Sequence, residues 1–165
     1  MAATPAAPVR RPRNRKTQIA ATAARLFAAR GYHRVGVDEV AAAVGITGGA
    51  MYRHFPTKAD LLARTVTDAQ DALDAALNRA DGLGAMVDAV AALAVEQPHI
   101  AALLDRERRH LVDPERTASR RRLGAALAGV RTAPGEARPH LHPDDTALLM
   151  RALLPVLASP GDPRV

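Results

Sequence analysis

Three side chains that donate hydrogen bonds lie close together in the sequence: the phenol of Tyr52, the imidazole of His54 and the ammonium of Lys58. Thr57 and Asp60 frame a helix start at the last of them, because Thr-x-x-Asp is the pattern of a capping box. Donors beside a helix N-terminus suit the negatively charged oxygens of a nucleic-acid backbone. A lone Tyr or His is usually structural, but this spacing favours contacts with phosphate groups.

The preceding residues predict two short helices joined by a glycine turn. Apolar residues at helical spacing begin at Val37 and stop at Gly45, which suits the left-handed conformation that ends a helix. Thr47 is placed to cap a second helix over residues 48–54, and Pro56 ends it. Two brief helices with a tight turn form a helix-turn-helix, which places its second helix in the major groove of DNA.

The order of residues in this region closely resembles the DNA-binding domain of the TetR (tetracycline repressor) family of bacterial transcription regulators. The resemblance covers about residues 16–62, including the pair Gly31-Tyr32. Its most specific part is the ordered set G-I-T-x-G-x-M-Y-R-H-F-P-T-K, which ends at Lys58. The resemblance implies a three-helix DNA-binding domain, followed by a helical domain that binds an effector and dimerises. One position departs from the pattern: the family usually has Ser or Thr where Gly36 caps the second helix.

The resemblance also implies that the start of the helix over residues 48–54 contacts base edges. Glycines there allow close backbone approach but no bidentate readout, so we expect discrimination to depend on Thr47, Arg53, DNA shape and a basic arm. The alternative is that the glycines merely relax the helix start. The predicted DNA contacts are Thr47, Gly48, Gly49, Tyr52, Arg53, His54 and Lys58, with Arg10, Arg11, Arg13 and Arg15 of the arm.

Charge is distributed unevenly along the chain. Residues 1–58 carry 10 of the 23 Lys and Arg residues but 2 of the 17 Asp and Glu residues. A basic front and a mildly acidic remainder are expected when one end of a protein meets a polyanion. Residues 1–14 combine prolines with small and basic residues, which predicts a disordered basic arm.

Several functional classes are excluded by composition. The chain has no cysteine, and His140 and His142 lack other nearby ligands, so we expect neither a metal nor a cofactor. The chain has no cysteine nucleophile, metal-ligand spacing or paired-carboxylate pattern that would indicate an enzyme. No stretch approaches the roughly 18 apolar residues of a membrane span, and the N-terminus lacks a signal-type apolar core. We therefore predict a bacterial cytoplasmic protein without a membrane partner, associated with the nucleoid when it binds DNA.

Alanine-rich, periodic sequence with few aromatic residues predicts an all-α fold. We expect a basic arm over residues 1–14, a helix-turn-helix domain over 15–57 and a regulatory and dimerisation domain over 58–165. The family-type DNA-binding domain would cover about 12–72 and include the start of the fourth helix. The predicted helices are 15–30, 37–44, 48–54, 58–77, 83–96, 98–111, 114–131 and 143–158. We expect the usual final helix of the family to be lacking after the last of these.

Aliphatic residues dominate the predicted regulatory helices, so we expect a pocket for a small lipophilic effector of acyl or steroid-like type. Glu107 falls on the apolar face of the predicted helix 98–111 and needs a partner there. An ion pair with Arg108, His110 or an arginine of the next helix is favoured over a role in sensing the effector. The predicted pocket residues are Met86, Val90, Leu93, Leu103, Leu104, Glu107, Leu123, Leu127, Leu149 and Leu153.

These observations predict a DNA-binding transcription regulator, most often a repressor in this family, that responds to an effector. It would bind a palindromic double-stranded DNA operator as a homodimer. The apolar face of residues 143–158 is too wide to leave in water and would form a two-fold interface or fold back on its own core. The alternative function is an architectural or non-specific DNA-binding protein with a degenerate regulatory half.

Overall fold

The computed structural model describes residues 15–80 and 83–128, and within these ranges all regular structure is helical. The basic arm and the predicted helix 143–158 lie outside the described residues. The all-α prediction is confirmed. The elements are α1 (Arg15–Arg30), the 3₁₀ turn η1 (Tyr32–Arg34), α2 (Val37–Ala43), α3 (Gly48–His54), α4 (Lys58–Leu77), α5 (Leu83–Glu96), α6 (Pro98–Asp105), the 3₁₀ turn η2 (Glu107–His110) and α7 (Glu115–Ala128).

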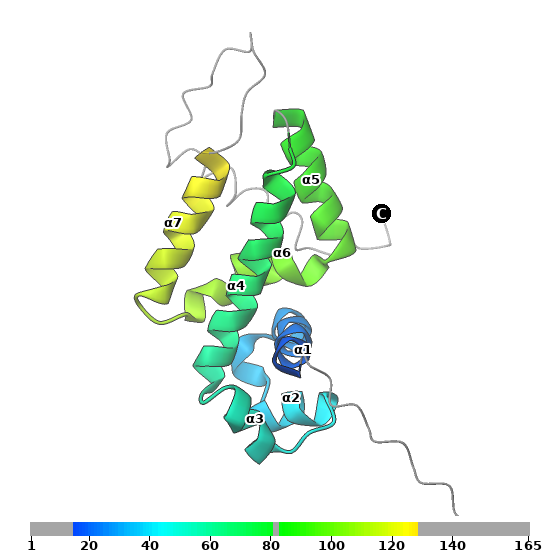
Figure 1. Cartoon of the computed structure of the whole chain (residues 1–165), viewed down its shortest axis with the longest axis vertical. Helices are drawn as coiled ribbons and strands as arrows, with labels where there is room; N and C mark the ends of the chain where they lie inside the picture. The colour runs from blue at the N-terminus through cyan, green and yellow to red at the C-terminus, as the bar shows by residue number, and fades with distance from the viewer. Residues whose placement is uncertain (1–14, 81–82, 129–165) are drawn as a thin grey trace, which may run out of the picture.

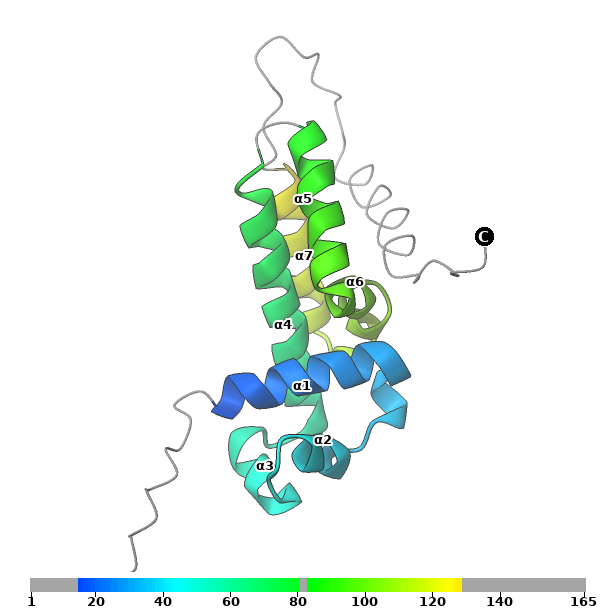
Figure 2. The same cartoon turned by 90° about the vertical axis from the view of Figure 1, so that its right-hand side faces the viewer.

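The helices form two parts that share α1 and α4. Figures 1 and 2 show α2 and α3 at one end of the molecule, below α1, which crosses the lower part of α4. Above this crossing, α5 and α7 lie alongside α4, and α6 packs against α1, α4 and α5. The longest of the described helices, α4, therefore runs from the helix-turn-helix end into the part that contains α5, α6 and α7, the predicted regulatory half.

One apolar core continues through both parts. Phe27 of α1, Met51 of α3 and Leu62 of α4 are fully buried, and so are Leu103 and Leu104 of α6. Burying one such side chain contributes about 1.5–3 kcal/mol relative to leaving it exposed. Because α1 contributes to the packing of both halves, the orientation of α3 is fixed against the regulatory helices by core contacts and not by a flexible linker.

Local capping signals set the boundaries of the short helices. Gly45 has φ 70°, the left-handed conformation expected after α2, and Gly36 caps the start of α2 without a side-chain hydrogen bond. The hydroxyl of Thr47 accepts from a backbone N–H in the first turn of α3 at 3.2 Å. Thr57 and Asp60 form the predicted capping box, with both reciprocal bonds at 3.0 Å. The predicted starts of α3 and α4 are confirmed.

The sixth helix is shorter than predicted. The periodicity predicts a helix to Leu111, but α6 ends at Asp105 and the chain tightens into η2. The tighter turn directs the Glu107 carboxylate toward η1, a contact that a continued α-helix would not provide. In the part of the chain described above, no single helix is long and apolar enough to cross a membrane. Helices α5 and α6 meet that length and composition only when joined, and the chain bends by 104° between them.

Candidate nucleic-acid interface

The first turn of α3 is open to solvent on one side and anchored on the other. Met51 and Phe55 are buried against the core and fix the orientation of the helix. Thr47 and Gly49, at the opposite side, are exposed. The Thr47 oxygen is engaged as the helix cap, but its O–H remains available as a donor. This arrangement allows the backbone of α3 to approach another surface closely.

Three predicted contact residues follow on the same helix. Tyr52 is 53% exposed, Arg53 is also exposed and His54 is half-buried. None of the hydrogen bonds or ion pairs formed among the described side chains uses Tyr52, Arg53 or His54. A phenol, a guanidinium and an imidazole are thus presented together beside the exposed start of α3, with their donors available for an anionic partner.

Lys58, the fourth predicted donor, begins α4 but does not point freely into solvent. Its Nζ lies 4.3 Å from the centre of the Tyr32 ring, in a cation–π contact. Burial lowers the pKa of Lys58 below its ordinary value. The sequence pattern placed Gly31-Tyr32 within the family resemblance but did not predict that Tyr32 would hold this lysine.

The absence of a side chain at Gly48 is explained by its neighbour Asp38, which the sequence did not predict to lie there. A Cβ at Gly48 would collide with the Oδ1 atom of Asp38, the second residue of α2, whereas a Cβ at Gly49 would meet nothing within 4 Å. The absent side chain leaves room for the Asp38 carboxylate beside the start of α3, where the helix dipole favours negative charge. For Gly48, packing against Asp38 therefore adds to the predicted effects of a glycine at the helix start.

The start of α1 brings two further basic residues to this end of the molecule. Arg15, one of the predicted arm arginines, is the first residue of α1, and its guanidinium donates to the carbonyl oxygen of Val44 at 3.2 Å. It therefore stabilises the C-terminus of α2 as well as adding charge. Lys16 lies over the Phe55 ring, 5.2 Å from its centre. Arg10, Arg11 and Arg13 lie outside the described residues.

The prediction of an ion pair for Glu107 is wrong. The side chain is buried, with 4% exposure, but its Oε2 accepts a hydrogen bond from the backbone N–H of Tyr32 at 2.8 Å. None of the ion pairs within residues 15–80 and 83–128 includes Glu107. The reason is the early end of α6: Glu107 begins the 3₁₀ turn η2, from which its carboxylate reaches the backbone of η1.

Comparison with known proteins agrees with this geometry. Residues 19–65, which span α1 to the first turns of α4, match the family model described as bacterial regulatory proteins, tetR family. Over these residues the chain is similar to the TetR family.

A stretch of 47 residues is 38% identical to the transcriptional activator FasR of Mycolicibacterium smegmatis, and it covers 28% of this chain and 22% of FasR. A TetR-family regulatory protein from Rhodococcus RHA1 has the same fold, with a TM-score of 0.70, 24% identity and coverage of 90% of this chain and 85% of that one. AibR, solved with isovaleryl coenzyme A and operator DNA, also gives a TM-score of 0.70, with 22% identity and coverage of 91% and 89%.

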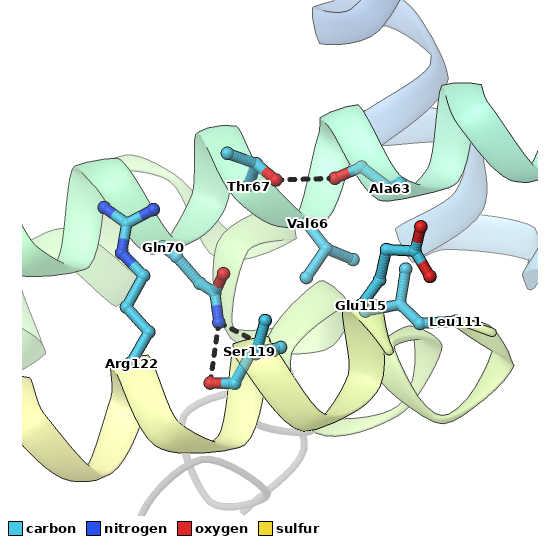
Figure 3. Close-up of a pocket in the computed structure, with 9 residues that line it drawn as sticks. Ala63, Val66, Thr67, Gln70, Leu111, Glu115, Ser119 and Arg122 are labelled. Atoms are coloured by element: carbon cyan, nitrogen blue, oxygen red, sulfur yellow. Dashed lines mark hydrogen bonds between the residues drawn. The ribbon is translucent and has the colours of Figure 1, made fainter. Parts of the chain in front are cut away.

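The regulatory half of this TetR-family fold contains a cavity of about 180 Å³ between α4 and α7. Figure 3 shows Gln70 of α4 reaching Ser119 of α7: its Nε2 donates to the Ser119 hydroxyl at 2.6 Å and to the Ser119 carbonyl at 3.0 Å. Arg122 of α7 bonds to Asp71 and Asp74 of α4, and these bonds raise its pKa. Polar contacts therefore hold α7 against α4 around the cavity.

A second cavity of about 220 Å³ lies between α1, α4 and α6. Leu103 lines it, whereas the other predicted pocket residues that the structure describes line neither cavity. Val90 and Leu104 are buried in the core, and Met86 and Leu93 pack against its edge. The Leu123 and Leu127 side chains, Leu149 and Leu153 lie outside the described residues, so the pocket they would complete stays a prediction.

Proposed function

We propose that this chain is a ligand-responsive transcription regulator, acting as a repressor on a palindromic DNA operator. The observation that carries this proposal is the exposed start of α3 with three unengaged donors beside it, within a TetR-family helix-turn-helix. Base contacts come from Thr47 and Arg53 and from the backbone at Gly49. Tyr52 and His54 contact phosphates, which position the helix without reading sequence.

Lys58 contributes to the same phosphate contacts from the start of α4. Its position links the phosphate contacts to the regulatory half, because α4 extends from this lysine past the cavity that lies between α4 and α7. An effector that binds one position of α4 more tightly than another shifts the population of DNA-binding molecules. A ligand without such differential affinity would change nothing, however tightly it bound.

The proposed effector is a small molecule with a lipophilic part. AibR, whose fold this chain shares, was solved with an acyl thioester and operator DNA. Val66 and Leu111 give the α4–α7 cavity an apolar surface, and Gln70 and Ser119 add polar groups that would orient a ligand. Thermal shift of the full chain with short acyl compounds tests this effector class.

The proposed assembly is a homodimer, because two-fold symmetry in the protein matches a palindrome in the operator. Residues 143–158 supply apolar leucines at helical spacing for that interface. Light scattering across micromolar concentrations tests it. A protein that stays monomeric at every concentration would remove the basis for a palindromic site.

Competition footprinting of the full chain on the DNA flanking its own gene tests the function. With excess non-specific DNA at moderate salt, a regulator protects one discrete site, because its specific affinity exceeds its non-specific affinity by about 10³ or more. Diffuse protection that disappears with competitor would instead identify an architectural or non-specific DNA-binding protein.

A further inference from the structure

Residues 106–110, at and just before η2, contact the end of α1 and the turn η1 that follows it. The buried Glu107 carboxylate accepts from the backbone N–H of Tyr32 at 2.8 Å. Arg106, next to it, donates to the carbonyl oxygen of Ala28 at 3.0 Å. These residues are separated by 75 or more positions in the sequence, so the contacts join the two halves directly.

The Tyr32 ring lies between η2 and the start of α4. On one side it stacks on His110 of η2, with ring centres 5.6 Å apart and an interplanar angle of 22°. The Lys58 ammonium also contacts the ring, 4.3 Å from its centre. His33, the neighbour of Tyr32, has its Nε2 3.1 Å from the Nδ1 of His110. One aromatic side chain therefore joins a regulatory element to the lysine proposed to contact DNA.

We propose that Tyr32 is a positioning residue for the phosphate contact of Lys58, and that Glu107 fixes Tyr32 in place from the regulatory half. This inference rests on the proposed function, because it takes Lys58 as a phosphate contact. A free lysine side chain loses rotamer freedom when it binds a phosphate. Contact with the ring restricts Lys58 in advance and leaves its remaining N–H donors free, so less freedom is lost on binding.

Glu107 extends this arrangement into the regulatory domain. Burying a carboxylate lowers the stability of the fold unless its oxygens are hydrogen-bonded. The bond to the Tyr32 amide therefore fixes the position of η2 relative to η1. A shift of α6 and η2 would then displace Tyr32, and with it the restraint on Lys58. The side chain that the sequence suggested as a core ion pair acts in this proposal as the link from the regulatory half to the DNA grip.

A double-mutant cycle tests the role of Tyr32. Tyr32→Leu, Lys58→Ala and the double variant are compared with the parent chain by fluorescence anisotropy on a labelled duplex containing the footprinted site. Tyr32→Leu should weaken binding roughly two- to five-fold, the size of a partly exposed cation–π contact. In the Lys58→Ala background the same change should cause no further loss. Tyr32→Phe keeps the ring and should keep most of the affinity.

A second pair tests the link to Glu107 without removing the ring. Glu107→Ala leaves the Tyr32 amide unbonded and should reproduce the Lys58-dependent loss, whereas Glu107→Gln keeps an acceptor oxygen and should restore affinity. Val112→Ala, at an exposed position beyond η2, is the matched control and should bind as the parent does. Unfolding midpoints measured on every variant show which of them remain folded. If the variants of one residue, Tyr32 or Glu107, do not fold, the variants of the other still test whether the position of Tyr32 affects DNA binding by Lys58.

The outcomes separate this inference from the proposed function. Full affinity in Lys58→Ala would remove the phosphate contact itself and therefore the basis of the proposed grip. A normal loss in Lys58→Ala, with Tyr32→Leu binding like the parent, more tightly, or with a loss that simply adds to that of Lys58→Ala, would overturn the positioning role alone. Loss of affinity in Tyr32→Leu only when Lys58 is present supports it.

Discussion

Replacing Lys58 with alanine removes one ammonium from the start of α4 and tests whether that charge contacts a phosphate. Each neutralised phosphate contributes about −0.9 to the slope of log affinity against log salt concentration. The variant should therefore lose affinity less steeply as salt rises. Between about 50 and 200 mM salt, the parent should lose about 3.5-fold more affinity than Lys58→Ala does. At any one salt concentration, the loss caused by the mutation should be similar for all DNA sequences.

Tyr52→Phe supplies the matched comparison, because it removes a hydroxyl donor from an exposed side chain and no charge. It should weaken binding by about 0.5–1.5 kcal/mol at every salt concentration and leave the slope unchanged. Anisotropy titrations on a specific and a scrambled duplex at four salt concentrations measure both quantities. An unchanged slope in Lys58→Ala, or a loss confined to particular base pairs, would refute the assignment of Lys58 to a phosphate.

Three further predictions concern stability and the arm. Gly49→Ala should raise the free energy of unfolding by about 0.5–1 kcal/mol in denaturant titration. Gly48→Ala should raise it by less, because the Asp38 side chain must move to make room for the new Cβ. An equal or larger increase for Gly48→Ala would contradict the packing argument. Deleting residues 1–13 should weaken DNA binding without lowering the unfolding midpoint, and a lower midpoint would mean that the arm packs on the fold. Burial and the charge of Arg25 lower the pKa of His99 below its ordinary 6.5. The unfolded chain then binds protons more readily, so unfolding free energy should fall as pH drops through 6.5 toward the lower folded pKa. His99→Gln should make the unfolding free energy less dependent on pH in this range. An unchanged pH profile in this variant would contradict the assignment of the effect to His99.

Elements bounded by local signals could be predicted from the sequence. The ends of α3 and α4 follow from Thr47, Thr57 and Pro56, which act within a few residues of their own positions. Gly45 ends α2 because the left-handed conformation is accessible to it without strain. The order of residues in the same region carries the family resemblance, which the match over residues 19–65 confirms.

Contacts between distant residues could not be predicted in the same way. The sequence predicts that Glu107 is buried, but its partner is a backbone amide 75 residues away, whereas side-chain chemistry alone favours an arginine or His110. Asp38 beside Gly48 and Tyr32 under Lys58 likewise depend on how α2, η1 and α4 pack. Helical periodicity identifies the buried face of an element but not the neighbour that covers it.

The predicted effector pocket shows the same limit. Val90 and Leu104 are predicted to line the pocket, but both are buried in the core, because periodicity does not distinguish a side chain that fills the core from one that lines a cavity. The α4–α7 cavity includes Gln70 and Ser119, polar residues whose hydrogen bonds form only when the two helices meet. Neither residue belongs to the predicted pocket set, which apart from Glu107 consists of aliphatic residues and methionine.

The ratio of affinities for the footprinted site and for a scrambled duplex of the same length tests the DNA-reading role most directly. Measured on the full chain at about 150 mM salt, this ratio should be about 10³ or greater, as for sequence-specific regulators. Arg53→Ala, which removes an exposed guanidinium from α3, should lower the ratio more than it lowers binding to the scrambled duplex. A ratio near one for the unmodified chain would contradict the account, because α3 would then contact DNA without reading its sequence.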